Sequence, residues 1–163
     1  MKNNPLEQFY KQYYNEVFLY ALSLCNSYYV AESLTSDTFY KALLNINKLK
    51  GHTKYWLFRV CKNNYIDLLR RKNPAKINNS DCLTDNLSIL DQLIKDEQNR
   101  KLYKAILQLK HPYKECILLY YFHKYTMKDI ATLMKISNGS VRTIIYRARL
   151  KLKTYLKEEN YEV

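Results

Sequence analysis

Apolar positions recur at spacings of three and four residues along most of the chain, which predicts helices rather than strands. The predicted helices cover residues 5–25, 30–45, 54–72 and 89–110, and a further helix begins at Pro112. Only two glycines and three prolines interrupt these patterns. A composition so poor in turn residues favours helices over a β fold with many turns.

The stretch from residue 126 to 152 has the pattern of two helices joined by a short turn. Thr126 can cap the first helix, with Asp129 three residues later as its capping-box partner. The break is expected at Ser137-Asn138-Gly139, where Ser137 can cap the second helix. The stretch therefore predicts a helix-turn-helix.

The second helix of this pair has two distinct sides. One side is an apolar stripe, formed by Val141, Ile145, Ala148 and Leu152. The other side is polar and basic, formed by Arg142, Thr143, Tyr146 and Arg149, with Arg147 and Lys151 at its flanks. Such a helix can pack on its domain and present its cations to the major groove of DNA. The alternative is an amphipathic helix pair whose basic face is only solvated.

The helix predicted over residues 54–72 also combines an apolar and a basic face. Its apolar face holds Leu57, Val60, Cys61 and Leu68. Its opposite face holds Arg59, Lys62, Asn63 and Arg70, and Trp56 lies at its start beside a loop that contains Gly51. Three of these side chains are cationic, which suits a track of phosphates. A solvated charged face is again the alternative.

The helical pattern fails between the two halves. Residues 73–90 contain Pro74 and the run Asn78-Asn79-Ser80, which are typical of a linker. We therefore predict an all-α fold of two small helical domains, residues 1–72 and 91–163, joined by a flexible linker over residues 73–90. The helix-turn-helix belongs to the C-terminal domain.

Composition and charge narrow the class of partner. Of the 163 residues 47% are hydrophobic and 26% are charged, which is typical of a globular protein. The formal net charge is +12, and it is divided as +6 over residues 1–72, −1 over residues 73–101 and +7 over residues 102–163. Two basic blocks flanking a slightly acidic middle favour a polyanionic partner, nucleic acid before an anionic membrane surface.

Other classes of function find little support in the sequence. No signal peptide is evident and no apolar run approaches the roughly 20 residues of a membrane helix, so a cytoplasmic protein is expected. The four cysteines, Cys25, Cys61, Cys82 and Cys116, are widely spaced, which favours buried reduced thiols over a metal site. We predict no metal and no cofactor. An enzyme acting on nucleic acid ranks lowest, because the acids are scattered and no glycine-rich phosphate loop is present.

Three blocks of residues resemble one family. The first is Ala31-Glu32-Ser33-Leu34-Thr35-Ser36-Asp37-Thr38-Phe39, and the second joins Trp56-Leu57-Phe58-Arg59-Val60 to Asn63, Asp67 and Arg70-Arg71. The third comprises Asp129-Ile130-Ala131, Ile136-Ser137, Gly139-Ser140-Val141-Arg142 and Arg147-Ala148-Arg149. In this order they resemble extracytoplasmic-function sigma factors of bacterial RNA polymerase, which keep only regions two and four. The resemblance covers about residues 9–156.

This resemblance implies a promoter-specificity subunit without catalysis of its own. Its partners would be core RNA polymerase, through the β and β′ subunits, promoter DNA and an anti-sigma factor. Core polymerase would be bound through Leu34, Asp37, Thr38, Phe39 and Lys41. The melted minus-ten element would be bound through Trp56, Arg59, Lys62, Asn63 and Arg70. The minus-thirty-five element would be recognised by Arg142, Thr143, Tyr146 and Arg147. Ser137, Arg149 and Lys151 would hold its phosphates, and Ser140 would also bind this element. The competing hypothesis is an autonomous helix-turn-helix regulator.

Overall fold

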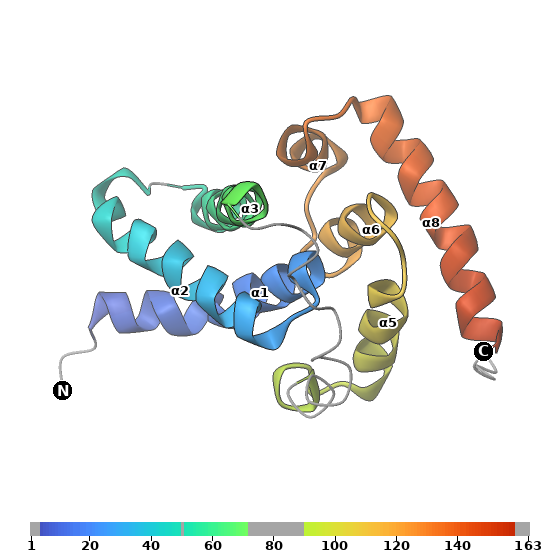
Figure 1. Ribbon diagram of the computed structural model, residues 1–163, viewed down its shortest axis with the longest axis horizontal. Coiled ribbons are helices and arrows are strands. Elements are labelled where there is room, and N and C mark those ends of the chain that lie inside the picture. Colours follow the sequence, from blue (N-terminus) through green and yellow to red (C-terminus); the bar gives the residue numbers. More distant parts are fainter. Residues whose placement is uncertain (1–3, 50, 72–89, 159–163) are drawn as a thin grey trace. The chain divides into compact units, whose positions relative to one another are not determined.

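In the computed structural model, every regular element within the described residues, 4–49, 51–71 and 90–158, is helical (Figure 1). The helices pack into two compact units, one within residues 1–93 and the other within residues 94–163. The all-α class with two helical domains is therefore confirmed. The predicted linker, residues 73–90, lies outside the described residues except for Leu90.

The N-terminal unit is built on three long helices. Helix α1 spans Pro5–Cys25, α2 spans Tyr28–Leu44 and α3 spans Thr53–Arg71, with a short 3₁₀ turn, η1, at Ile46–Lys48. Helices α1 and α2 lie side by side and run in opposite directions, and α3 packs against both of them (Figure 1). The three predicted N-terminal helices are confirmed, with ends shifted by no more than about two residues.

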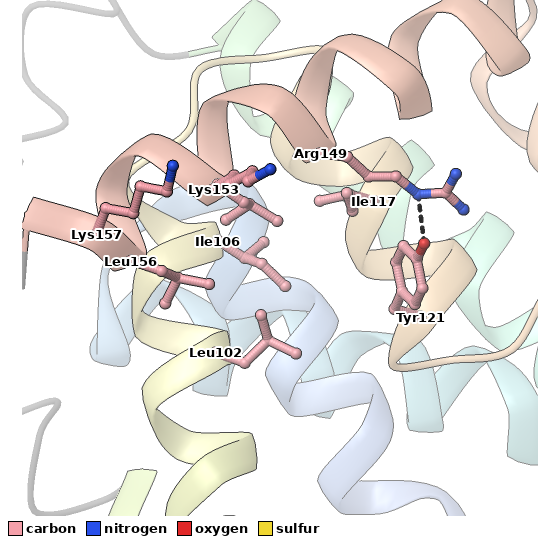
Figure 2. Close-up of a pocket in the computed structure, with 9 residues that line it drawn as sticks. Leu102, Ile106, Ile117, Tyr121, Arg149, Lys153, Leu156 and Lys157 are labelled. Atoms are coloured by element: carbon pink, nitrogen blue, oxygen red, sulfur yellow. Dashed lines mark hydrogen bonds between the residues drawn. The ribbon is translucent and has the colours of Figure 1, made fainter. Parts of the chain in front are cut away.

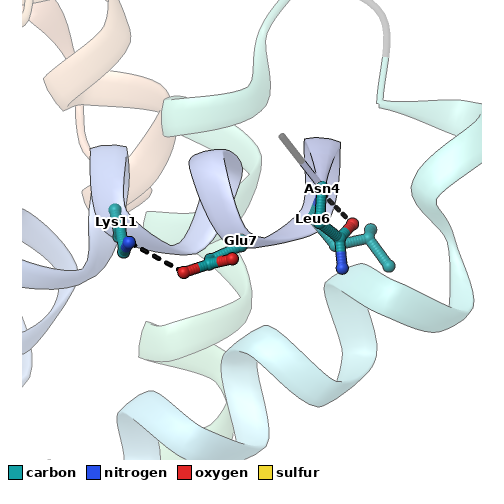
Figure 3. A network of polar contacts seen from close by, with 4 residues as sticks. All are labelled: Asn4, Leu6, Glu7 and Lys11. Atoms are coloured by element: carbon teal, nitrogen blue, oxygen red, sulfur yellow. Dashed lines mark hydrogen bonds and ion pairs between the residues drawn. The ribbon is translucent and has the colours of Figure 1, made fainter. Parts of the chain in front are cut away.

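Side-chain caps determine where these helices begin and end. The side chain of Asn4 accepts a hydrogen bond from the Leu6 N–H at 3.1 Å, and Glu7 pairs with Lys11 one turn later at 2.7 Å (Figure 3). At the corner between α1 and α2, Asn26 adopts the left-handed conformation with φ 53°, which asparagine tolerates better than most residues. The next residue, Ser27, accepts a hydrogen bond from the backbone N–H of Val30 and so caps α2.

The core of the N-terminal unit is rich in aromatic rings. The rings of Tyr20 on α1 and Phe58 on α3 are stacked with centroids 4.5 Å apart, and both residues are fully buried. Phe39 on α2 contacts Phe9 and Tyr10 of α1 with centroid distances of 5.9 and 4.9 Å. Aromatic pairs at these distances add to the stabilisation that apolar burial provides. They fix α2 and α3 on the surface of α1.

The C-terminal unit contains helices α5 (Glu97–Leu107), α6 (Tyr113–Tyr121), α7 (Met127–Met134) and α8 (Asn138–Glu158). Helix α6 is the centre of this unit, because it packs against each of the other three. Its four consecutive residues from Cys116 to Leu119 are fully buried. The sequence pattern predicted this apolar helix as the floor of the helix-turn-helix, and the packing agrees.

The prediction of one continuous helix over residues 89–110 is wrong. The chain is helical at residues 90–93, then leaves the helix at residues 94–96 before α5 begins at Glu97. Asp96 causes the new start, because its carboxylate accepts a hydrogen bond from the Asn99 N–H at 3.0 Å. The N-cap signal was present in the sequence, but the apolar spacing on both sides concealed it.

The cysteines lie where the sequence predicted. Cys25, Cys61 and Cys116 are buried free thiols, whereas Cys82 lies outside the described residues. Burial raises the pKa of the Cys116 thiol to about 12, with a smaller contribution from the neighbouring Glu115. This thiol therefore stays protonated at neutral pH. Within the described part of the chain, no helix has the length and apolar character needed to cross a membrane.

Candidate nucleic-acid interface

Helix α3 exposes the basic face that its sequence pattern predicted. Arg59, Asn63 and Arg70 are exposed, and Lys62 is half-buried. The apolar side is turned inward, with Leu57, Phe58 and Cys61 completely buried. Offsets of four and eleven residues place the three exposed side chains on one side of the helix. The structure therefore brings a polar amide and several cations together along one surface.

The loop before α3 contains a glycine with a required conformation. Gly51 has φ +88°, a region that L side chains rarely adopt. A Cβ atom at Gly51 would meet no atom within 4 Å, so the backbone conformation, not a close neighbour in this chain, is the reason for glycine here. Trp56 is half-buried at the start of α3, and its backbone N–H donates to the carbonyl oxygen of His52. That bond ties the loop to the first turn of the helix.

Helix α2 presents a different subset of its residues to solvent than the resemblance implied. Leu34, Thr38 and Phe39 are 4%, 0% and 5% exposed, so most of their surface lies inside the unit, although Leu34 lines a groove together with Asp37 and Lys41. Asp37 and Lys41 are exposed. The sequence contained this distinction already, because Leu34 and Thr38 share the apolar face of α2. Burial therefore separates two groups among the five residues expected to bind core polymerase, and the assignment itself stays a prediction.

A buried amide connects α2 with α3. The side chain of Asn64 donates to the Thr38 hydroxyl at 3.4 Å and accepts a hydrogen bond from the Lys41 ammonium. Sequence reasoning singled out Asn63 and missed Asn64, which is only 8% exposed. A groove of about 340 Å³ lies beside this link, and Tyr29, Asp37 and Lys41 are among its lining residues. The link holds Lys41 at the edge of that groove.

Helices α7 and α8 form the predicted helix-turn-helix. Thr126 accepts a hydrogen bond from the Asp129 N–H at 3.1 Å and caps α7. Lys135, at φ 57°, ends α7 in the left-handed conformation. Ser137 caps α8, because its hydroxyl accepts from the Ser140 N–H at 3.1 Å. The turn therefore comes slightly earlier than expected, at residues 135–137, and Asn138 and Gly139 are the first residues of α8.

Both sides of α8 match the sequence pattern. The apolar stripe is buried, with Val141, Ile145, Ala148 and Leu152 between 0% and 7% exposed. On the opposite side the exposed residues are Arg142, Thr143, Tyr146 and Arg147. The Thr143 hydroxyl donates to the carbonyl oxygen of Gly139 at 3.1 Å. Within the described residues, Arg142 and Arg147 make no ion pair, so their guanidinium groups remain available to an anionic partner.

The residues expected at phosphates have contacts inside the unit as well. Ser137 uses its hydroxyl as the cap of α8 and lies 2.8 Å from the Ser140 hydroxyl. The guanidinium of Arg149 donates to the Tyr121 hydroxyl, as Figure 2 shows. The ammonium of Lys151 lies 5.2 Å from the ring centre of Tyr113. The cap at Ser137 was predicted from the sequence, whereas the contacts of Arg149 and Lys151 join α8 to α6 and cannot be predicted from the spacing within one helix.

Sequence reasoning also missed an apolar groove in the C-terminal unit. It has a volume of about 300 Å³ and is lined by residues of α5, α6 and α8 (Figure 2). Leu102 and Ile106 come from α5, Ile117 from α6 and Leu156 from the end of α8. The basic side chains Lys153 and Lys157 lie along its α8 side. The one available signal was that Leu156 extends the apolar stripe of α8 by another turn.

Each of the two units contains a match to a known family model. Residues 9–74 match the family model for sigma-70 region 2, and residues 99–152 match the model for sigma-70 region 4. The chain belongs to the sigma-70 family. The two matches contain the candidate surfaces on α3 and α8, respectively, and their order along the chain is the order that the resemblance predicted.

Relatives cover nearly the whole of this sigma factor. It is 29% identical over 154 residues to the ECF RNA polymerase sigma factor SigM of Bacillus subtilis, covering 91% of this chain and 93% of SigM. It is 28% identical over 169 residues to RNA polymerase sigma factor YlaC of the same organism, with coverage of 98% and 96%. The predicted membership in the extracytoplasmic-function group is confirmed.

A solved structure supports the same fold. The chain superposes with a TM-score of 0.69 and 20% identity on the sigma factor RpoE of Bartonella quintana, crystallised in complex with the anti-sigma factor NepR. The match covers 93% of this chain and 96% of that one. The two family models and the relatives SigM and YlaC show that the protein is a sigma subunit of RNA polymerase, the function that the sequence predicted.

Proposed function

We propose that this sigma factor divides promoter recognition between the two exposed basic surfaces, with α3 at the minus-ten element and α8 at the minus-thirty-five element. The observation that carries the proposal is that each unit matching a sigma-70 region exposes a face of cations and amide or hydroxyl groups on one helix. The chain supplies binding and orientation and no catalysis of its own. It acts in the cytoplasm, where core polymerase is found.

The α3 surface suits a melted strand. Arg59, Lys62 and Arg70 provide positive charge along a strand of phosphates. Asn63 can both donate and accept hydrogen bonds, so it can recognise the edge of an unpaired base. The loop at Gly51 and the half-buried Trp56 lie at the start of this helix, where an extruded base can be received. We propose that this end of α3 holds the base and that the cations hold the backbone.

The α8 surface suits the major groove. An exposed helix face with arginines fits that groove, and an arginine can pair with both acceptors of a guanine. We assign direct base recognition to Arg142, Thr143, Tyr146 and Arg147. Ser137 and Ser140 lie at the N-terminus of α8, where a phosphate is favoured by the helix dipole.

Core polymerase is proposed to bind along the exposed side of α2. Asp37 and Lys41 are exposed there, and Tyr40 beside them is 63% exposed. Leu34, Thr38 and Phe39 shape this surface from inside the unit. We further propose an anti-sigma factor as a partner, because the Bartonella quintana protein of the same fold was crystallised with one.

Reconstitution with core RNA polymerase tests the proposal. Transcript starts mapped with the holoenzyme should share two upstream elements with a constant separation. Transcription from a template with either element scrambled should fall sharply. Efficient transcription from both scrambled templates would contradict promoter recognition by this chain.

Asn63→Ala separates the role of α3 from that of α8. The variant should retain core binding and binding to the upstream element, but should open linear duplex poorly, because the contact to the unpaired base is lost. Permanganate reactivity of thymines in the minus-ten element measures opening. A template already melted across that element should restore part of the activity, since the cost of unpairing is removed. Normal opening by Asn63→Ala would refute the assignment.

A further inference from the structure

Two cations of α8 lie against tyrosine rings of α6. The Nε–H of Arg149 donates to the Tyr121 hydroxyl, and the guanidinium carbon lies 5.3 Å from the centre of the Tyr121 ring and 6.0 Å from that of Tyr120. The Lys151 ammonium lies 5.2 Å from the centre of the Tyr113 ring. These distances are within the range at which a cation is attracted to an aromatic face. We call Tyr113, Tyr120 and Tyr121 the tyrosine bracket.

The two cations lie on opposite flanks of the buried stripe of α8. Arg149 directly follows the buried Ala148, and Lys151 directly precedes the buried Leu152. At 100° per residue, these positions are displaced from the stripe in opposite rotational directions. Contacts on both flanks oppose a roll of α8 about its own axis in either direction. A roll would change which exposed side chains of α8 reach the base edges.

The exposed arginines on the other side of α8 have different surroundings from Arg149 and Lys151. Within the described residues, neither Arg142 nor Arg147 makes an ion pair or lies over an aromatic ring. The guanidinium of Arg149, in contrast, already has a hydroxyl acceptor and two ring faces. A phosphate contact would have to compete with these interactions. The basic residues of α8 therefore fall into two groups with different surroundings.

We propose that Arg149 and Lys151 are positioning residues, which the tyrosine bracket holds so that α8 presents Arg142, Thr143, Tyr146 and Arg147 at a fixed rotation. They set the selectivity of upstream recognition without neutralising phosphates. This inference rests on the proposed role of α8 as the DNA-recognition helix. It replaces the assignment of Arg149 and Lys151 to phosphates that their charge suggested.

The salt dependence of DNA binding tests whether Arg149 and Lys151 neutralise phosphates. Holoenzymes that contain the wild-type protein or its Arg149→Gln or Lys151→Gln variant are titrated with a fluorescent 30-base-pair duplex carrying the mapped upstream element. The slope of log K against log salt concentration is negative, and loss of one phosphate contact lowers its magnitude by about 0.9. We expect the slope of both variants to equal that of the wild type. A fall of about 0.9 for each variant would show phosphate contacts and overturn the proposal.

Uncharged substitutions in the tyrosine bracket test whether it sets the selectivity of upstream recognition. The double variant Tyr113→Leu Tyr121→Leu removes the ring partner of Lys151, and the hydroxyl and nearer ring partner of Arg149. It leaves Tyr120 and every cation in place. In holoenzyme we expect its preference for the upstream element over a scrambled element to fall about tenfold, with an unchanged salt slope. Tyr113→Phe, which keeps the ring, should retain the preference. If the double variant lowered only the melting temperature and kept the preference, the bracket would be structural and the proposal refuted.

These outcomes are separable from failure of the proposed function. If Arg142→Ala and Arg147→Ala left the preference intact, α8 would not be the recognition helix, whatever the bracket variants did. If those two variants lost the preference but the double tyrosine variant did not, recognition by α8 would stand and only the bracket would fail. Far-ultraviolet circular dichroism of each variant checks that the helices are intact.

Discussion

At the scale of single residues, the exposed arginines of α8 carry the sharpest prediction. Arg142→Ala and Arg147→Ala should each weaken holoenzyme binding to the upstream element by about 1–3 kcal/mol, the range expected for a lost bidentate base contact. Lys110→Ala, an exposed cation between α5 and α6, is the matched control and should have little effect. Competition with scrambled duplex measures the difference. An equal loss on specific and scrambled DNA would show that these arginines do not recognise bases.

The two glycines give a second residue-scale prediction, because only Gly51 has a backbone conformation that favours glycine. Gly51 has φ +88°, so Gly51→Ala should destabilise the N-terminal unit by roughly 1–2 kcal/mol. Gly139 lies in the first turn of α8 with no atom within 4 Å of an added Cβ, so Gly139→Ala should stabilise the C-terminal unit by up to about 1 kcal/mol. Urea unfolding followed by circular dichroism measures both. Changes of the same sign would contradict the conformational argument.

Residue roles were predictable where they follow from helix periodicity. The stripe from Val141 to Leu152 and the exposure of Arg142 and Arg147 both follow from one helix with one buried side. The contacts of Arg149 with Tyr121 and of Lys151 with Tyr113 join two helices, and nothing within α8 indicates them. Helix periodicity predicts that a basic side chain is accessible, but the group that this side chain contacts depends on packing between helices.

At the scale of elements, the start of α8 depends on one hydroxyl. Ser137→Ala removes the acceptor of the Ser140 N–H and should cost about 1 kcal/mol of stability. Ser137→Asp keeps an acceptor and adds a negative charge at the helix N-terminus, so its stability should approach that of the wild type. Thermal unfolding of the full-length protein compares the three. Equal destabilisation by alanine and aspartate would mean that the cap contributes nothing.

Element boundaries were predictable where a cap and an apolar period agree. Thr126 and Ser137 mark the starts of α7 and α8 in both the sequence and the structure. The break at residues 94–96 was missed, because Leu93, Ile94 and Leu102 continue an apolar pattern that masks the cap at Asp96. Periodicity alone therefore overestimates helix length when a short helix precedes a longer one.

At the scale of the whole molecule, the chain divides its positive charge between two units. Residues 1–72 carry a net +6 and residues 102–163 a net +7, and each block contains one of the proposed DNA-binding surfaces. Each unit alone is expected to bind duplex weakly and without much selectivity, as a phosphate-driven contact does. Selectivity for a promoter then requires both surfaces to engage at once, which depends on the distance between them.

The distance between the two promoter elements limits what the free protein can bind. Elements centred near positions minus ten and minus thirty-five are about 25 base pairs apart, or roughly 85 Å at 3.4 Å per base pair. The predicted linker of about 18 residues can span at most roughly 60–65 Å when fully extended. The free protein would therefore have to hold its linker close to full extension in order to bridge both elements, which costs much conformational entropy. Core polymerase must fix the separation instead. At physiological salt, DNase footprinting should show protection of both elements with holoenzyme and of neither with the free protein. Protection of both elements by the free protein would instead favour an autonomous regulator.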